Sequence, residues 1–295
     1  MPFQLKHLAL ALLVVAIWGF NFVVIKLGVA AVPPLLLTGL RFTFAALPAV
    51  FFVARPTAPL HFVAAYGIML GVIKFGLLFV AMHIGFSASL SSLVLQLQAF
   101  FTIGFAAIVL HERPKPSQLA GAALAFSGIA IIAATRWSAQ ALLPMILAII
   151  AAAAWGVANI ISKASGEKNA LSFIIWSSLF SPLPLFALSW ATEDHAEIIR
   201  VLTHPSWTAI GATLFLAWVS TLLGFTIWNN LLSRYSAASV APFSLLVPVF
   251  GIASGVLLLG DQFGPLLIVG SVLVFAGLAL NVFGPRLLRA DPAKA

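Results

Sequence analysis

The sequence predicts an all-α integral membrane protein with ten transmembrane helices, arranged as two inverted five-helix repeats around a central cavity. Three observations carry this prediction. Apolar residues make up 62% of the 295 residues and charged residues only 7%, whereas an ordinary soluble domain has about 25% charged residues. Loop signals divide the chain into ten apolar stretches, and similar motifs recur in its two halves. A bilayer is therefore the solvent in which this chain is expected to fold.

The ten apolar stretches are long enough for helices that cross a bilayer, which need about 20 residues each. Their apolar runs are continuous rather than alternating, which argues against a membrane β-barrel. Breakers such as Pro33-Pro34, Pro114 to Pro116 and Gly264-Pro265 separate them. The predicted limits are 8–26, 34–54, 62–82, 87–109, 117–135, 142–162, 171–191, 208–232, 236–259 and 265–284.

The first stretch follows Lys6 and His7, as the apolar part of a signal peptide would. The only early A-x-A pattern, Ala9 to Ala11, precedes most of this stretch, and further apolar spans follow without a break. The segment is therefore predicted to be a retained helix.

The distribution of Lys and Arg predicts the orientation. With a cytoplasmic N-terminus, ten basic residues fall in inner loops and three in outer loops. An even number of helices places both ends on one side, so both termini are predicted to be cytoplasmic in a multi-pass protein. The net charge of +8 then reflects topology, since scattered basic residues do not form a nucleic-acid surface. The inner set is Lys6, Arg55, Arg113, Lys115, Lys163, Lys168, Arg234, Arg286, Arg289 and Lys294, and the outer set is Lys26, Arg136 and Arg200.

Motifs in the two halves recur. Trp18-Gly19 is followed eight residues after the Trp by Lys26, and Trp155-Gly156 is followed at the same spacing by Lys163. Because five helices per half is an odd number, the second half enters the membrane from the opposite side, as in many secondary transporters. The predicted organisation is a first half at 1–135, a connecting loop at 136–141, a second half at 142–285 and a cytoplasmic tail at 286–295. An offset of 149 also relates Glu112 to Asp261, Gly121 to Gly270 and Gly128 to Gly277.

Two basic residues fall inside predicted spans. Lys74 lies near the centre of the third span, where a Lys costs about 2.5–3.5 kcal/mol on insertion scales. It is expected to line a wet cavity, or else to sit in a helix contact as a neutral or carbonyl-bonded Lys. Arg41 lies nearer the outer face of the second span. Two roles remain open for it, namely bonding carbonyls across the bundle and binding a substrate carboxylate.

The first and sixth spans each carry a Trp and an Asn on one helix face. Trp18 and Asn21 form the first pair, and Trp155 and Asn159 form the second. An Asn in hydrocarbon needs partners, which interhelical amide bonds supply. Each Asn is therefore expected to line a cavity or to join helices, and each Trp to line the cavity or to pack.

The fourth span places Ser92 and Gln96 on one face. Regular helical geometry puts Gln98 about 180–200° away from Gln96, so only one of the two glutamines is expected to point into a cavity, and Gln96 is favoured. The eighth span carries Trp218, Thr221, Phe225 and Trp228 at helical spacing. Such a stripe is more often packing than binding, but Trp228 and Asn229 remain candidates.

The ninth span holds Ser244 between Pro242 and Pro248. A mid-helix proline frees a backbone carbonyl, which is tolerated at membrane depth where water or protein satisfies it. The expectation is a helix break whose free carbonyl accepts an ammonium group, and the alternative is a packing kink.

All seven acidic residues lie in loops or at span ends. A carrier of organic cations needs a buried negative charge, so the cargo is expected to be zwitterionic or anionic, with its carboxylate near Lys74 or Arg41. Proton coupling remains open, with Lys74, His83, Glu112 and Asp261 as the candidate carriers. Cys is absent and the six His residues are scattered, so neither a metal site nor a cofactor is predicted.

Several motifs along the chain are similar to a known family. They are Trp18 through Lys26, Gly39 through Phe42, Ser92 through Gln96, Gln98 through Thr102, Val240 through Val249, and Asn281 through Gly284. With the paired Trp-Gly motifs, they resemble the EamA family of the drug/metabolite transporter superfamily, and within it the branch that exports O-acetylserine and cysteine. The resemblance covers nearly the whole chain, and Lys74 departs from the neutral residue expected there.

The resemblance implies an exporter of amino-acid metabolites in the bacterial inner membrane, with a central cavity lined mainly by the first, third, fourth, sixth, eighth and ninth helices. The expected partners are a small zwitterionic amino acid and the lipid bilayer. An exchanger of organic anions or sugar phosphates from the same superfamily is the main alternative. A membrane enzyme would need a cluster of reactive side chains, and a sensor would need an output domain; the sequence indicates neither.

Overall fold

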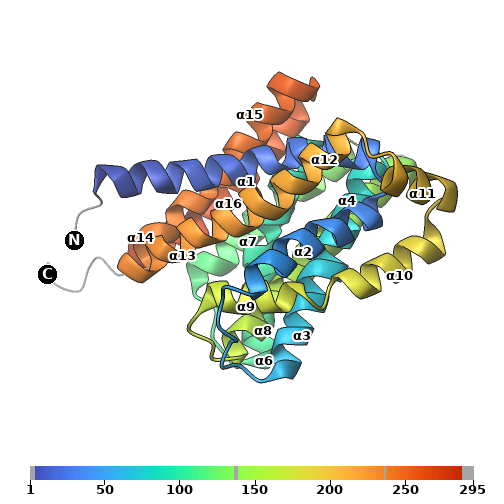
Figure 1. Ribbon diagram of the computed structural model, residues 1–295. Coiled ribbons are helices and arrows are strands. Elements are labelled where there is room, and N and C mark those ends of the chain that lie inside the picture. The colour runs from blue at the N-terminus through green and yellow to red at the C-terminus, as the bar shows by residue number, and fades with distance from the viewer. Residues whose placement is uncertain (1–3, 136–138, 236, 288–295) are drawn as a thin grey trace, which may run out of the picture.

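The computed structural model describes residues 4–135, 139–235 and 237–287, and the regular elements in these ranges are all helical. Figure 1 shows the helices packed against one another in a bundle, with the long helix α1 running across it. In this part of the chain, nine helical segments are long and apolar enough to cross a membrane, and Pro34–Val50 is a shorter apolar helix. The predicted all-α membrane class is confirmed.

In chain order the elements are α1 (Leu5–Ala31), α2 (Pro34–Val50), α3 (Leu60–Gly67), η1 (Ile68–Phe75), α4 (Gly76–His83), α5 (Ala88–Val94), η2 (Leu95–Leu97), α6 (Gln98–Val109), α7 (Pro116–Ala134), α8 (Ala139–Ala164), α9 (Ala170–Ser178), α10 (Pro182–Thr192), α11 (His195–Thr203), α12 (Trp207–Leu214), η3 (Phe215–Leu223), α13 (Gly224–Arg234), α14 (Ala237–Val240), η4 (Ala241–Leu246), α15 (Val247–Leu259) and α16 (Pro265–Leu287).

Two predicted spans differ from the structure. The second was expected to reach residue 54, but α2 ends at Val50 and a turn follows it. The seventh was expected as one helix, but it breaks between α9 and α10. Pro182 begins α10, and the Ser181 hydroxyl at the break donates a hydrogen bond of 2.9 Å to the carbonyl of Gly67. The loop after α10 also contains a helix that was not expected, α11, which is capped by Asp194.

Four spans contain a non-α stretch at mid-length. The third and eighth predicted spans hold the π-helical segments η1 and η3, and the fourth and ninth hold the 3₁₀ segments η2 and η4. Each kind changes the number of residues per turn and so rotates the following side chains relative to an α-helix. These segments therefore decide which residues face the interior.

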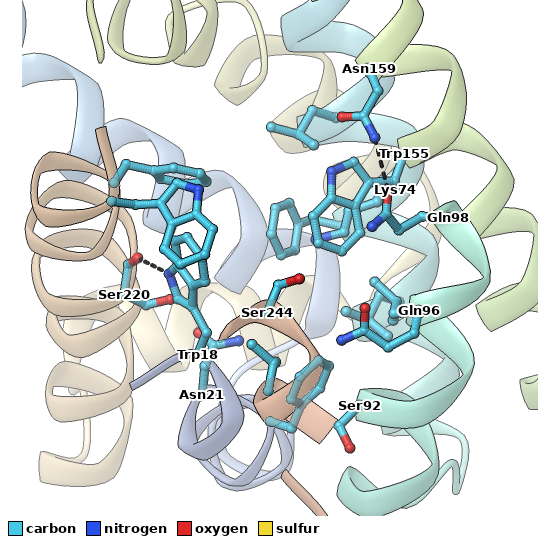
Figure 2. A pocket seen from close by; sticks show the side chains of 18 of the residues that line it. Trp18, Asn21, Lys74, Ser92, Gln96, Gln98, Trp155, Asn159, Ser220 and Ser244 are labelled. Atoms are coloured by element: carbon cyan, nitrogen blue, oxygen red, sulfur yellow. Dashed lines mark hydrogen bonds between the residues drawn. The ribbon is translucent and has the colours of Figure 1, made fainter. Parts of the chain in front are cut away.

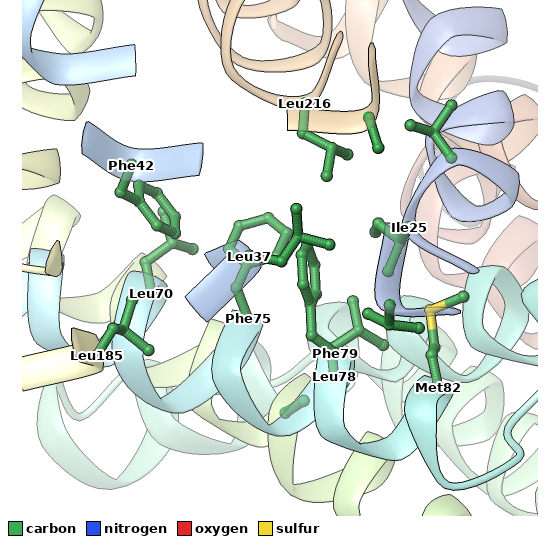
Figure 3. Packing of buried hydrophobic residues seen from close by; sticks show 14 of the residues in the cluster. Ile25, Leu37, Phe42, Leu70, Phe75, Leu78, Phe79, Met82, Leu185 and Leu216 are labelled. Carbon is green, nitrogen blue, oxygen red and sulfur yellow. The ribbon is translucent and has the colours of Figure 1, made fainter. Parts of the chain in front are cut away.

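Apolar side chains from several helices fill the space between them. Figure 3 shows Phe42, Phe75 and Phe79 together with Leu37 and Leu70 in one cluster. Lipid tails are as apolar as these side chains, so close packing rather than escape from water holds the helices together.

Glycines allow the closest helix contacts. A Cβ atom on Gly121 would collide with the carbonyl of Gly277, and one on Gly128 would collide with that of Gly270, so α7 and α16 lie backbone to backbone. Gly19 of α1 packs in the same way against α15, and Gly156 of α8 against α6. Small residues at such positions permit this approach.

Of the segment predicted to connect the halves at 136–141, residues 136–138 lie outside the described residues, and α8 begins at Ala139. Most of the predicted tail, 288–295, also lies outside them, whereas α16 extends to Leu287.

Candidate functional site

A central cavity of about 280 Å³ opens among the helices. Figure 2 shows Trp18 and Asn21 on one side of it, Trp155 and Lys74 on the other, and Ser244 between them. The cavity brings together ten of the candidate residues that the sequence singled out: Trp18, Asn21, Arg41, Lys74, Ser92, Gln96, Trp155, Asn159, Trp228 and Ser244.

Other lining residues were not expected, and most of them are apolar, such as Phe22, Leu70 and Phe225. An apolar residue in a membrane span carries no signal that separates cavity from lipid. Among the polar lining residues, Ser220 was not expected, and Gln98 was weighed against Gln96 but not favoured.

Lys74 lies in the π-helical segment η1 and is 4% exposed. Its Nζ atom is 3.1 Å from the centroid of the Phe75 ring and 4.3 Å from that of the Trp155 ring. The ammonium therefore contacts aromatic faces rather than a backbone carbonyl, and cation–π attraction offsets part of the cost of removing it from water.

Arg41 comes from α2 and is 2% exposed. Its Nη2 donates a hydrogen bond of 3.2 Å to the hydroxyl of Thr221, and its Cζ lies 4.0 Å from the Phe75 ring centroid. Nε and Nη1 have no hydrogen-bond partner among the described residues. Arg41 thus links two helices through a hydroxyl group rather than through carbonyls, and it keeps two unpaired donors.

The two asparagines have different surroundings. Asn159 Nδ2 donates to Gln98 Oε1 at 2.8 Å and to Thr102 Oγ1 at 3.0 Å, so Asn159 both joins α8 to α6 and lines the cavity. Asn21 is 6% exposed, and its Oδ1 has no partner in the described part of the chain.

Both Gln96 and Gln98 line the cavity, so the expectation that only one of them does so was wrong. The chain forms the 3₁₀ segment Leu95–Leu97 at this point. A 3₁₀ turn advances about 120° per residue, so positions two apart lie about 120° from each other rather than nearly opposite. Ser92 lines the same cavity, but its hydroxyl donates to the Ser89 carbonyl at 2.7 Å.

The expectation of a free backbone carbonyl near Pro248 was also wrong. Pro248 is not in the middle of a helix, because it lies in the first turn of α15, after the 3₁₀ segment η4. The carbonyl of Ser244 accepts the backbone N–H of Val247. Neither Pro242 nor Pro248 lines the cavity, although the helix is interrupted there as predicted.

The aromatic stripe of the eighth span does not share one face, because Trp218 lies in the π-helical segment η3 whereas Phe225 and Trp228 lie in α13. Phe225 and Trp228 line the cavity, and their ring centroids lie 5.3 and 5.2 Å from that of Trp18. Trp218 is 46% exposed and donates to the Phe44 carbonyl. Trp18 donates to the Ser220 carbonyl at 3.0 Å. Asn229, the other candidate of this span, is not among the lining residues.

None of the acidic residues in the described ranges lines the central cavity. Glu112 forms an ion pair with Lys163. The carboxylate of Asp261 accepts the backbone N–H of Ser89 at 2.9 Å, at the start of α5. His83 bonds the Val29 carbonyl and does not line the cavity. The described residues contain no group of three or more His, Cys, Asp or Glu that could hold a metal ion.

Comparisons with known proteins agree with this architecture. A crystal structure with a TM-score of 0.67 and 18% identity covers 98% of this chain and 100% of its own, which shows a shared fold. The chain is 44% identical to a "Probable amino-acid metabolite efflux pump" of Escherichia coli strain K12, over 97% of both chains. It is 45% identical to a protein of the same description from Salmonella typhimurium, over 95% of this chain and 96% of the other.

A more distant relative, the "Probable terminal-alkyne amino-acid exporter" of Streptantibioticus cattleyicolor, is 28% identical over 65% of this chain and 63% of its own. The model of the EamA-like transporter family matches residues 5–134 and 142–283, which is nearly the whole chain. With two relatives above 40% identity over almost their full length, the chain belongs to the EamA-like transporter family.

Proposed function

We propose that this chain exports small zwitterionic amino-acid metabolites, such as cysteine or O-acetylserine, across a bacterial inner membrane. The observation that carries the proposal is the charge of the central cavity. Lys74 and Arg41 line it, and no acidic residue of the described ranges does. A substrate carboxylate would accept the two free donors of Arg41 or contact Lys74, since charged donors favour such partners. The two relatives from Escherichia coli and Salmonella typhimurium, described as probable amino-acid metabolite efflux pumps, support the same class of cargo.

The substrate ammonium group needs a different partner. Asn21 Oδ1 is an unpaired buried acceptor, and Gln96 lines the opposite side of the cavity (Figure 2). The Trp18, Trp155 and Trp228 rings would enclose the remainder of the substrate and could contact its ammonium by cation–π attraction. A monovalent organic cation would gain these contacts but would meet two like charges.

Transport would proceed by alternating access between two inverted five-helix halves, 1–135 and 142–285, which together contribute ten transmembrane helices. Matching local geometry in the two halves supports this arrangement. The π segments η1 and η3 are each followed directly by a glycine, Gly76 and Gly224, that begins the next α-helix. The reciprocal contacts of Gly121 with Gly277 and of Gly128 with Gly270 relate α7 and α16. The ten-to-three distribution of basic residues supports cytoplasmic termini.

The test is efflux of labelled amino acids from preloaded proteoliposomes. Lys74→Met keeps the volume of the stem and removes the charge, and we expect it to slow export of O-acetylserine about 10–100-fold, since a charged hydrogen bond contributes about 1.5–3 kcal/mol. Lys168→Met, at an exposed loop lysine, is the matched control and should export normally. Normal export by a well-folded Lys74→Met would contradict the proposed carboxylate contact.

The alternative function, exchange of organic anions or sugar phosphates, is tested in the same vesicles. It would appear as counterflow of a phosphate ester that exceeds that of the amino acids. An imposed pH gradient tests proton coupling, for which Lys74 is the candidate carrier inside the cavity.

A further inference from the structure

A second, smaller cavity of about 150 Å³ lies beside the central one. It is formed where α6 and α8 end, and its lining includes Thr102, Ile103, Glu112, Arg113 and Lys163. Asn159 lines both cavities. The second cavity is therefore a neighbour of the proposed substrate site, and Asn159 borders both.

The charges of the second cavity differ from those of the first. The Glu112 carboxylate and the Lys163 ammonium form an ion pair, and their side chains are 49% and 57% exposed. Exposed pairs contribute little to stability because water solvates both partners when they separate. This pair can therefore open readily and re-form with other charges. It offers a cation and an anion side by side, which is the complement of an amino-acid zwitterion.

Neutral hydrogen bonds connect residues that line the two cavities. Asn159 donates to Gln98 and Thr102 across the gap between α8 and α6, as Figure 2 shows for Gln98. Amide and hydroxyl groups can exchange these bonds for bonds to a passing ammonium or carboxylate group. A polar substrate would thus be hydrogen-bonded throughout its passage.

Lys26 and Asp261, which correspond to Lys163 and Glu112 in the other half, are both hydrogen-bonded to backbone groups. Lys26 donates to the carbonyls of Met82 and Phe86, and Asp261 accepts the N–H of Ser89. Gly255 packs directly against Ser89. Entry to the central cavity in this conformation is therefore expected from the end that carries Glu112.

We propose that the second cavity is a loading site for amino-acid zwitterions, here named the vestibule. The substrate separates the Glu112–Lys163 pair, its ammonium binding Glu112 and its carboxylate binding Lys163, before it passes Asn159. This proposal rests on the proposed export function. It adds a second site of different chemistry. The vestibule offers one charged partner to each charge of the substrate, whereas the charged side chains that line the central cavity, Lys74 and Arg41, are both cations.

The test uses the absence of cysteine from the native sequence. Single cysteines are introduced as Ile103→Cys in the vestibule and Ser244→Cys in the central cavity, in the full chain in proteoliposomes. Labelling by N-ethylmaleimide is measured with and without O-acetyl-L-serine. When the concentration of O-acetyl-L-serine is several times its dissociation constant, we expect it to slow labelling about threefold or more at both positions.

Second substitutions separate the two sites. Glu112→Gln or Lys163→Gln should abolish protection of position 103 and leave position 244 protected at saturating substrate. Lys74→Met should abolish protection of position 244 and leave position 103 protected. N-acetyl-L-serine, which lacks the ammonium group, should protect position 103 less than the zwitterion does. Glu197→Gln is the matched control, because Glu197 and Arg200 form a similarly exposed ion pair on α11, away from both cavities.

Protection at 244 without protection at 103 would overturn the vestibule and leave the export proposal standing. Protection at 103 that survives both Glu112→Gln and Lys163→Gln would also overturn it. Absence of protection at both positions would overturn the export proposal as well.

Discussion

At the scale of single residues, the ring of Phe75 is shared by two cations. The Nζ of Lys74 and the Cζ of Arg41 both lie within 4.0 Å of its centroid. Two like charges in one largely apolar cavity repel each other, and the face of an aromatic ring is one of the few uncharged groups that attracts both. Phe75 is therefore as much a part of the charge arrangement as the two basic residues are.

Replacing this ring should reveal its role. Phe75→Leu removes the aromatic face and keeps an apolar side chain, so we expect slower export and a loss of about 1–2 kcal/mol of stability beyond the packing loss, as cation–π contacts of desolvated cations suggest. The measurements are efflux and thermal unfolding in detergent. Phe173→Leu, at a buried ring that contacts Tyr66, controls for lost volume. Equal effects of the two substitutions would show that the ring acts only as packing.

At the scale of elements, the sequence indicated which polar residues within the helices would line the central cavity, but it indicated the directions of their side chains less well. A polar group inside an apolar stretch is conspicuous because hydrocarbon penalises it, which is why Lys74, Asn21 and Asn159 could be identified. Their directions were inferred from uniform α-helix geometry. The 3₁₀ turn at Leu95–Leu97 and the π segment at Phe215–Leu223 break that assumption, and no composition signal marks either.

The apolar wall of the cavity and the break between α9 and α10 could not be predicted for a related reason. Both depend on which neighbouring helix lies opposite, as with Ser181, whose hydroxyl bonds the carbonyl of Gly67. Such contacts join positions that are far apart in the sequence, and the pattern of a single chain does not specify them.

Loop contacts between elements offer a pH-dependent test. The carboxylate of Glu167 accepts backbone N–H groups of Asn169, Ala58 and Thr57, as well as the Thr57 hydroxyl. These bonds, that of Asn169 foremost, lower the pKa of Glu167 to about 2. A lowered pKa means that the stabilisation is complete above the ordinary pKa of 4.5 and is lost as the pH falls towards 2.

Glu167→Gln should therefore lower the free energy of unfolding by about 1 kcal/mol at neutral pH, a modest value because the group is partly solvated. The difference from the unmodified protein should shrink as the pH falls below 4.5. Thermal unfolding between pH 3 and pH 7 measures it. A difference that stays constant over this range would contradict the assignment.

The contact between α7 and α16 tests the role of glycine at the element scale. Gly128→Val places a side chain where the Gly270 carbonyl now lies, so the helices must separate. We expect a loss of about 1–3 kcal/mol of stability, as for other overpacked sites. Gly104→Val, at a glycine with open space around its Cβ position, is the control, and thermal unfolding in detergent is the readout. Equal stability of the two variants would mean that α7 and α16 do not pack as described.

At the scale of the whole molecule, the two ends of the transport path are closed to different degrees. Beside Glu112 lies a cavity, whereas at Asp261 the carboxylate is bonded to the start of α5 and Ser92 is completely buried. Inverted repeats can exchange such arrangements, so that one end opens as the other closes. Asp261 would then hold its end of the path shut in this conformation, and this is the outer end in the proposed orientation.

Weakening that contact should shift the molecule towards opening at the outer end. Asp261→Asn keeps the shape of the side chain but replaces a charged acceptor by a neutral one, which forms a hydrogen bond about half as strong. With Ser92→Cys as the reporter, an impermeant thiol reagent added outside intact cells should label Asp261→Asn several times faster than the parent. Asp194→Asn, which weakens a similar bond at the start of α11, should not change the rate. Labelling of Ser92→Cys that is equally slow in both variants would mean that Asp261 does not hold this end closed, and labelling of Lys115→Cys from outside would reverse the proposed orientation.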